Sequence, residues 1–272
     1  MTKLLHGAYL SIAGTSILLG FILVCCSSNG ADDQGEILIK VIDAPANYQQ
    51  INIVVNRVSI HQAGNAPDIG WKFLNIGSPV SFNLLKLLNG HSVQLAFSKI
   101  PVGTYDQIKI DYGTCTITTN GNPILLVLDP SITHGNIIPY GFQIVQGQQF
   151  QLTFDYDAYS SVYPSGFLNG YIFKPKIRVQ NTALSGSITG AVRDSNNVAA
   201  PAKITTFTGF DTVATYNDTT TGSFQLSDLP EDTSYTVIII PYNTLLMNDT
   251  LPGIVVTHQT ATNLGIIKLK YK

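Results

Sequence analysis

Charged side chains are scarce in this sequence: Asp, Glu, Lys and Arg make up only 12% of the 272 residues, against about a quarter in an average soluble protein. The few Lys and Arg residues form no cluster that could neutralise phosphates, so nucleic acid is not expected as a partner. The abundance of Thr, Asn, Gly, Ile and Val beside so few charges is typical of exported all-β proteins with neutral polar surfaces. Long helices are not expected.

Cysteine is also rare. Two of the three cysteines, Cys25 and Cys26, lie where an N-terminal apolar segment turns polar, which leaves Cys115 as the only thiol of the folded region. A single cysteine can form neither an intrachain disulfide nor a cysteine metal site. Cys115 lies in a β-like run, so we expect it to be a small buried core residue.

Catalytic signatures are missing as well. The sequence has no Gly-x-Ser-x-Gly motif and no glycine loop that could bind phosphate. Its later histidines are scattered, without the spacing that gathers metal ligands: His61, His91, His134 and His258. We therefore predict that the protein is not an enzyme and has no cofactor. A triad assembled from distant residues stays open as the alternative.

The N-terminal segment has the layout of a secretory signal. Lys3 precedes an apolar stretch over residues 10–24, which ends at the cysteine pair and turns polar and acidic. Lipoprotein signal peptidase cuts before a diacylglyceryl cysteine and prefers an aliphatic residue three positions earlier, which Leu23 provides for Cys26. We predict lipidation of Cys26, with Cys25 as the less favoured site. An uncleaved membrane helix is the other alternative.

Lipidation would divide the N-terminal region into a signal peptide (1–25) and a flexible tether (26–35). Two or three acyl chains would hold the protein on a membrane, so we expect an outer-membrane lipoprotein that faces the periplasm or the cell surface. Asp32 and Asp33 resemble the acidic tether with which Bacteroidetes-type bacteria send lipoproteins to the cell surface. An ordinary flexible tether has the same composition.

Residues 36–181 contain a succession of runs rich in β-branched residues and separated by turn residues, which predicts strands. These runs are 36–42, 51–60, 71–74, 93–97, 105–112, 114–118, 124–128, 150–156 and 171–179. A capping-type Asn83 and the pair Asn89-Gly90 predict a short helix or turn between them.

Alternation within two of these runs predicts which strands pair. Apolar side chains fall on the even positions of 150–156, which directs Asp155 and Asp157 to the outer, solvent-facing side. Basic residues alternate in the same way in 174–178. We expect the acidic and basic strands to lie side by side, joined by exposed ion pairs.

Six ordered blocks in this region resemble a family of exported lipoproteins known as domain of unknown function 4382. The blocks are Val41–Ala46, Trp71 with Leu74, Phe82–Gly90, Ile100–Lys109, Phe154–Ala158 and Tyr171–Pro175. The resemblance spans nearly all of the region. It implies a β-sandwich on a lipoprotein and brings no known activity with it.

Residues 184–272 start a second series of strands after the polar joint 180–183. We expect strands at about 185–192, 203–208, 212–216, 223–226, 235–240, 253–257 and 264–269, which suggests a small seven-stranded sandwich. Residues 222–237 resemble the carboxypeptidase regulatory-like domain, a prealbumin-type or Ig-like sandwich. Most such domains are spacers, although related folds include carbohydrate-binding modules.

The candidate contact residues lie in an aromatic loop over 156–171. Rings beside Ser, Asn and Asp suit a sugar or a protein partner, and the side chains that we expect to make this contact are Tyr159, Tyr163, Phe167 and Tyr171. The alternative is that these rings only close the end of the sandwich.

Two further sets of residues have weaker signals. Asp155 and Asp157, with Asp43, could hold a calcium ion, although solvent-facing charge or pairing with Lys174 and Lys176 explains them better. Three Asp-Thr pairs resemble O-glycosylation acceptors of Bacteroidetes, and turns contain the same pair often; their threonines are Thr212, Thr219 and Thr250.

Together these patterns predict an all-β protein with two β-sandwich domains, at 36–181 and 184–272, behind a lipoprotein signal peptide. We expect a non-catalytic lipoprotein of the bacterial cell envelope, anchored in the membrane by its lipid, that acts as a binding, structural or adhesion component. The alternatives are a carbohydrate-binding accessory lipoprotein of a glycan-uptake system and a subunit of a larger envelope assembly.

Overall fold

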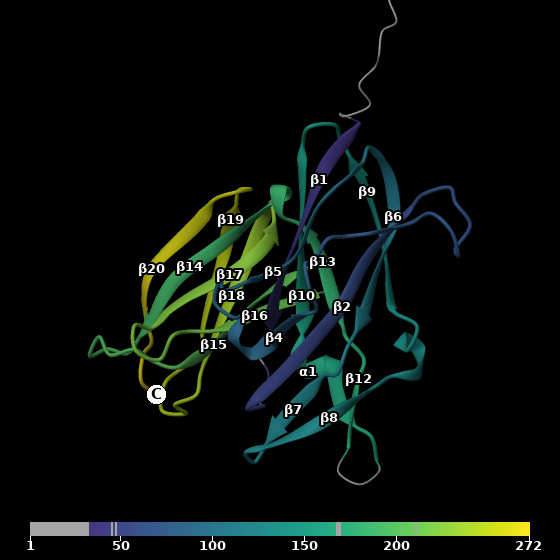
Figure 1. Ribbon diagram of the computed structural model, residues 1–272. Helices are drawn as coiled ribbons and strands as arrows, with labels where there is room; N and C mark the ends of the chain where they lie inside the picture. Colours follow the sequence, from purple (N-terminus) through teal and green to yellow (C-terminus); the bar gives the residue numbers. More distant parts are fainter. Residues whose placement is uncertain (1–32, 45, 47, 167–169, 210) are drawn as a thin grey trace, which may run out of the picture. The chain divides into compact units, whose positions relative to one another are not determined.

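Strands dominate the computed structural model, which describes residues 33–44, 46, 48–166, 170–209 and 211–272 (Figure 1). The elements of the first sandwich are β1 (Gln34–Ala44), β2 (Gln50–Gln62), β3 (Trp71–Phe73), β4 (Val80–Asn83), η1 (Leu84–Lys86), β5 (Val93–Pro101), β6 (Gly103–Tyr112), β7 (Thr116–Thr119), β8 (Asn122–Leu128), η2 (Pro130–Ile132), β9 (Asn136–Ile144), β10 (Gln149–Asp157), α1 (Ala158–Ser161), β11 (Val162–Pro164), β12 (Tyr171–Phe173) and β13 (Ile177–Asn181). Those of the second are η3 (Thr182–Leu184), β14 (Ser185–Arg193), β15 (Ala202–Thr208), β16 (Asp211–Tyr216), β17 (Ser223–Pro230), β18 (Asp232–Pro241), β19 (Asp249–Val256) and β20 (Ala261–Lys268).

The first sandwich packs a four-stranded sheet, β13-β10-β1-β5, against a larger sheet, β11-β12-β8-β7-β2-β6-β9 with β3 and β4 paired to β2. Alternation in β1 sends Ile37 and Ile39 into the core, where they join Ile53 and Ile60 of β2 in the opposite sheet. All four are fully buried. Cys115 is buried in the same core, as the sequence predicts.

Most predicted strands of this sandwich are confirmed, and the structure adds three that the sequence reading lacks: β4, β9 and β11. The run 171–179 is not one strand. It divides into β12, which pairs with β8 and β11, and β13, which pairs with β10 in the other sheet. Pro175, which has no N–H to donate to a ladder, lies between the two strands.

The predicted short helix is confirmed as the 3₁₀ turn η1. Asn83 caps it, because its side-chain oxygen accepts a hydrogen bond from the Leu85 N–H at 3.1 Å. Asn89 and Gly90 both have positive φ, 60° and 83°, the conformation that Asn and Gly adopt most easily. The chain therefore turns there, as the sequence predicts.

The second sandwich consists of a three-stranded sheet, β17-β14-β20, and a four-stranded sheet, β16-β15-β18-β19. All seven predicted strands are present. The chain leaves β17 at Pro230 and enters β18 in the opposite sheet at Asp232, so Leu229-Pro230 lies at a corner between the two sheets. Phe224 and Tyr235 on either side of it are buried in the second core. The all-β fold with two sandwiches is thus confirmed.

The outer face of β10 contradicts the sequence-based expectation. Asp155 is not solvent-facing, because the second sandwich covers this side of the sheet: Thr153 donates a hydrogen bond to Asp228 of β17 at 3.3 Å, and Arg178 donates to the Asp228 carbonyl at 3.4 Å. Residues 150–156 alternate as predicted, but both faces of the strand are covered over most of its length.

Asn89 connects the two sandwiches at a second point through hydrogen bonds. Its side-chain amide donates to the Ser223 carbonyl at 3.3 Å, and its side-chain oxygen accepts from the Gln225 N–H at 2.5 Å. These are main-chain groups of β17, an edge strand of its sheet. The side chain of Asn89 therefore forms hydrogen bonds with two backbone groups of β17 that face away from the neighbouring strand at this sheet edge.

Within the described part of the chain, from residue 33 onward, the structure contains no helix long and apolar enough to cross a membrane.

Candidate functional site

Tyrosines gather at one end of the first sandwich, around α1 and the strands beside it. Tyr159 lies on α1 and exposes 67% of its surface. Tyr163 and Tyr171 lie on the paired strands β11 and β12. The ring of Tyr171 meets the ring of Tyr48 edge-on, with 6.5 Å between the centroids. We call Tyr48, Tyr159, Tyr163 and Tyr171 the tyrosine cluster.

Three phenols of this cluster, those of Tyr48, Tyr159 and Tyr171, influence one another electrostatically. Burial raises the pKa of Tyr48, and the phenols of Tyr171 and Tyr159 raise it further. Tyr163 donates a hydrogen bond to Asp129 at 2.7 Å. Hydrogen bonds from Ser131 and Tyr163 lower the pKa of the Asp129 carboxyl to about 2, which keeps an ionised carboxylate at the edge of the cluster at any physiological pH.

The sequence-predicted contact residues have different positions in this arrangement. Tyr159 and Tyr163 are exposed, whereas Tyr171 is partly buried and packs against the core. Phe167 lies outside the described residues. Tyr48 and Asp129 were not predicted, because they come from distant parts of the chain and no local motif marks them.

Tyr156, another ring of the predicted loop, belongs to the core. It is fully buried, and its hydroxyl shares a hydrogen bond of 2.8 Å with that of Tyr112. Burial raises the pKa of Tyr156, so this phenol stays neutral and serves packing.

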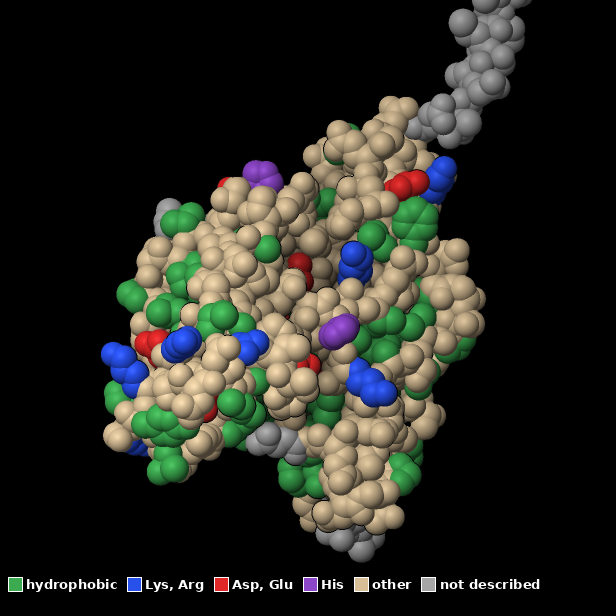
Figure 2. Space-filling model, turned by 90° about the vertical axis from the view of Figure 1, so that its left-hand side faces the viewer, with side chains coloured by type: hydrophobic (Ala, Val, Ile, Leu, Met, Phe, Trp, Pro, Cys, Tyr) green, Lys and Arg blue, Asp and Glu red, His purple; other side chains and the backbone are tan. Residues whose placement is uncertain are grey.

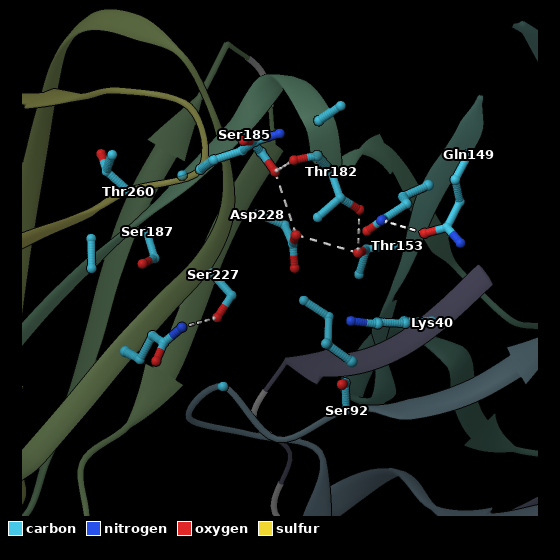
Figure 3. A pocket seen from close by; sticks show the side chains of 18 residues that line it. Lys40, Ser92, Gln149, Thr153, Thr182, Ser185, Ser187, Ser227, Asp228 and Thr260 are labelled. Atoms are coloured by element: carbon cyan, nitrogen blue, oxygen red, sulfur yellow. Dashed lines mark hydrogen bonds between the residues drawn. The ribbon is translucent and has the colours of Figure 1, made fainter. Parts of the chain in front are cut away.

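A second candidate site is a polar cleft of about 610 Å³ between the two sandwiches (Figure 3). Its lining consists mostly of hydroxyl and amide side chains, with one carboxylate, Asp228, and one ammonium group, Lys40. The first sandwich contributes residues of β1 and β10, and the second those of β14 and β17. Figure 2 shows a face on which tan surface predominates, with separate Lys, Arg, Asp and Glu side chains and several hydrophobic patches distributed over it.

Asp228 reaches the cleft through an irregularity of its strand. Gly186 pairs with Leu229 and Ile188 with Leu226, so Ser187 alone lies opposite two residues of β17, Ser227 and Asp228. This β-bulge, with Asp228 at φ 54°, bends the strand locally and re-aims its side chains.

Neighbours fix the carboxylate of Asp228. One of its oxygens accepts a hydrogen bond from Thr153 at 3.3 Å and lies 3.5 Å from the Ser185 hydroxyl, which has a closer acceptor in the Thr182 carbonyl at 3.2 Å (Figure 3). Burial raises the pKa of Asp228, and the bond from Thr153 and the charge of Arg178 offset part of that increase. A partly desolvated carboxylate of this kind interacts more strongly with a hydrogen-bond donor than an exposed one does.

The three acidic residues considered for calcium do not form a metal site. Asp43 is buried and accepts a hydrogen bond from the Ala158 N–H at 3.2 Å. Asp157 caps α1 by accepting from the Ser160 N–H at 2.9 Å. Among the residues that the structure describes, no three His, Cys, Asp or Glu side chains could hold a metal ion together.

Asp155 instead forms a buried ion pair with Arg178, with 2.7 Å between carboxylate and guanidinium. The predicted pairing of the acidic and basic strands is correct, since Asp155 lies opposite Arg178 in the β10–β13 ladder. Asp157 also makes the expected contact with Lys176, at 3.8 Å. The prediction that all these pairs are exposed is wrong, because the side chains of Asp155 and Arg178 are only 8% and 11% exposed.

The remaining sequence-predicted sites lie on the surface or outside the described residues. Thr212, Thr219 and Thr250 are all exposed, and their glycosylation stays a prediction. Cys25 and Cys26 lie outside the described residues, so the lipidation site also stays a prediction.

His61 is buried between two hydrogen-bond acceptors. Its Nδ1 lies 2.7 Å from the Asp106 carboxylate and its Nε2 lies 3.1 Å from the Ala66 carbonyl. Since neither acceptor can donate, this arrangement favours the cationic imidazole, in which both ring nitrogens carry a proton. The hydrogen bond with Asp106 is the main reason that the pKa of His61 is raised.

We expect this cation to make stability depend on pH. The contribution is fully present below the unfolded-state pKa of about 6.5 and is lost as the pH rises through the higher pKa of folded His61. The free energy of unfolding in urea should fall over that window, and Asp106→Asn should flatten the decline. His91→Gln, at an exposed histidine, is the control. An unchanged decline in Asp106→Asn would contradict the assignment.

The fold and these sites define an all-β protein of two joined sandwiches, with a tyrosine cluster at one end of the first and a polar cleft between them. The chain belongs to the family of domain of unknown function 4382: the family profile (DUF4382) matches residues 34–175. This confirms the resemblance carried by the six sequence blocks.

Other comparisons are distant. No functionally curated protein matches the sequence. Among solved structures, the chain is similar to the Bacillus anthracis TIE protein (11% identity, TM-score 0.27, 88% of this chain and 34% of that one). It is also similar to BcpA, the major pilin subunit of Bacillus cereus (11%, 0.26, 88% and 71%), and to the shaft pilin SpaA of Lactobacillus rhamnosus GG (7%, 0.26, 89% and 98%). The chain spans about a third of the TIE protein's length. Similarities of this strength say nothing about a ligand.

Proposed function

We propose that the protein is a non-catalytic binding component of the bacterial cell envelope, anchored by lipid on Cys26. The apolar segment that ends at the cysteine pair, the polar residues that follow and the low charge of the chain support the anchor and an exported location. The anchor would lie in the outer membrane, with the two sandwiches facing the periplasm or the cell surface. We infer that the second sandwich is a carboxypeptidase regulatory-like spacer.

The tyrosine cluster is the observation that carries the binding role. The four tyrosines come from three separate segments of the chain. One of the tyrosines, Tyr163, is held by a hydrogen bond to the ionised carboxylate of Asp129. Rings that are held in place lose little conformational entropy on contact, which favours binding. Exposed ring faces beside hydroxyl and carboxylate groups suit a sugar or a protein surface.

A glycan ligand is the first alternative that this geometry favours, because sugars present C–H faces to rings and hydroxyl groups to carboxylates. The protein would then be an accessory lipoprotein of glycan uptake. The second alternative is a subunit of a larger envelope assembly. A glycan array tests the former, and co-purification of defined partners from membranes tests the latter.

Loss of the exposed rings should strongly weaken binding at the tyrosine cluster. We expect Tyr159→Ala with Tyr163→Ala to weaken capture on the array or by the partner at least tenfold, since central aromatic contacts contribute about 2 kcal/mol or more. Tyr242→Ala is the matched control, because Tyr242 is a similarly exposed tyrosine of the second sandwich. Equal retention of the double variant and the wild-type protein would refute the contact role.

The anchor is tested separately. Labelled palmitate should enter the wild-type protein and Cys25→Ala, whereas Cys26→Ala should remain unlabelled and leave the membrane fraction, because no acyl chain then binds the bilayer. Labelling of Cys26→Ala that disappears in Cys25→Ala would move the site to Cys25. An unlabelled wild-type protein would remove the anchor and the proposed location with it.

A further inference from the structure

The polar cleft between the sandwiches is separate from the tyrosine cluster, and its lining is organised as a binding site. Asp228 stands on a β-bulge, a feature often found beside functional sites because it re-aims a side chain. The hydroxyl group of buried Thr153 donates to its carboxylate, and the hydroxyl of buried Ser185 lies beside the same oxygen. These two side chains orient the carboxylate before any ligand arrives.

The chemistry across the cleft is complementary. Figure 3 shows the second oxygen of Asp228 directed into the cleft and the side chain of Lys40 extending toward the same space from β1. A carboxylate only accepts hydrogen bonds and an ammonium group only donates them. A ligand that spans the two groups must therefore carry both donors and acceptors.

The rest of the lining restricts the ligand further. Hydroxyl and amide groups surround the charged pair, among them those of Ser187, Gln151 and Thr260. These neutral groups can both donate and accept, and they provide no counter-charge for an ionic ligand. A cleft of about 610 Å³ lies within the range of about 300–1,000 Å³ that is usual for small-ligand sites.

We propose that the cleft between the two sandwiches binds a small neutral saccharide, with its hydroxyl groups donating to Asp228 and accepting from Lys40. Vicinal hydroxyl groups supply a donor and an acceptor on adjacent atoms, and the further hydroxyls of the sugar pair with the Ser, Thr and Gln side chains. A zwitterionic amino acid would satisfy only the two charged groups and leave the remaining polar lining without partners. The site goes beyond the proposed function, because it lies apart from the tyrosine cluster and does not depend on the lipid anchor.

The test is calorimetric titration of the full-length protein, in a detergent without a sugar headgroup, with maltose, cellobiose and lactose up to about 10 mM, a range that detects millimolar affinity. At least one of these sugars should bind. Asp228→Asn keeps the size and tolerates the same backbone conformation, and it should weaken binding at least about tenfold, the usual effect of losing a charged hydrogen bond. Asp194→Asn, at an acid elsewhere on the second sandwich, is the control.

Circular dichroism shows whether Asp228→Asn keeps the fold. If it does not, Lys40→Gln provides an independent test of the site. Lys40→Gln should also weaken sugar binding. The Tyr159 and Tyr163 double variant should bind these sugars as the wild-type protein does. The two sets of variants therefore distinguish a wrong assignment of the tyrosine cluster from a wrong assignment of the cleft. The proposal is overturned if none of the three sugars binds. It is also overturned if Asp228→Asn and Lys40→Gln bind them unchanged, or if glycine or glutamate binds in the cleft and the sugars do not.

Discussion

Arg178→Met is expected to lower the free energy of unfolding by about 3–5 kcal/mol, because it leaves a buried carboxylate without its partner. Asp155 and Arg178 lie under the second sandwich, with 2.7 Å between them. Burial already raises the pKa of Asp155 in the wild-type protein, and the Arg178 guanidinium offsets part of that effect. Without the guanidinium, ionised Asp155 must be desolvated with no compensating charge.

Two further variants separate the buried charge from a general loss of contacts. Arg57→Met breaks a pair of similar length, 2.6 Å to Asp111, but the side chain of Arg57 is 53% exposed, so the expected loss is below about 1 kcal/mol. Asp155→Leu combined with Arg178→Met removes both charges and should recover most of the stability. Urea unfolding of the four proteins measures these differences.

The pH dependence of Arg178→Met adds a check on the mechanism. In this variant the folded-state pKa of Asp155 lies above the value of about 3.9 in the unfolded chain, so folding becomes less favourable as the pH rises through that window. The deficit relative to the wild-type protein should shrink in acid, where Asp155 is protonated. A deficit that is equal at neutral and acidic pH would point to lost packing and not to the unpaired charge.

This ion pair also shows what the sequence could predict. The alternation of residues 150–156 correctly located the strand, its buried aromatic face and its basic neighbour. Alternation distinguishes two faces of a strand but carries no information on what covers the second one. That depends on Asn89, Thr153 and β17, which meet only when the two sandwiches pack together.

The two candidate sites also differ in how far the sequence predicts them. Tyr159 and Tyr163 were predicted because they lie close together in a stretch rich in rings, and Tyr48 was missed because it is more than a hundred residues away. No pattern in the sequence predicted the polar cleft. Its lining residues are common Ser, Thr and Gln, and its carboxylate is directed by a bulge that follows from the register of β14 against β17.

Gly186 lies near the start of β14, at the edge of the polar cleft. We expect Gly186→Ala to destabilise the protein by about 3 kcal/mol, the upper end of the usual cost of overpacking. A Cβ atom at this position would collide with the Thr257 carbonyl oxygen and lie 2.8 Å from that of Thr260. Both obstacles are main-chain atoms, so a side-chain rotation cannot remove the clash.

Hydrogen bonds prevent the opposing loop from moving away. Gln259 donates to the Ser185 carbonyl at 2.7 Å, and Ser187 donates to the Thr260 carbonyl at 2.9 Å, one bond on each side of Gly186. A shift that accommodates the methyl group must therefore lengthen at least one of them. Because Thr260 and Gly186 both line the polar cleft, the variant should also weaken any saccharide bound there.

Gly141→Ala is the matched control for this prediction. Gly141 is an exposed glycine of β9 that has no left-handed φ, and no atom lies within 4 Å of the position that a Cβ would occupy there. Alanine should be neutral at this site or stabilise the protein by up to about 1 kcal/mol, because it restricts the unfolded chain. Thermal and urea unfolding compare the two variants. If Gly186→Ala were as stable as Gly141→Ala, the loop 257–260 would have to yield without cost, and the close packing that we assign to Gly186 would be wrong.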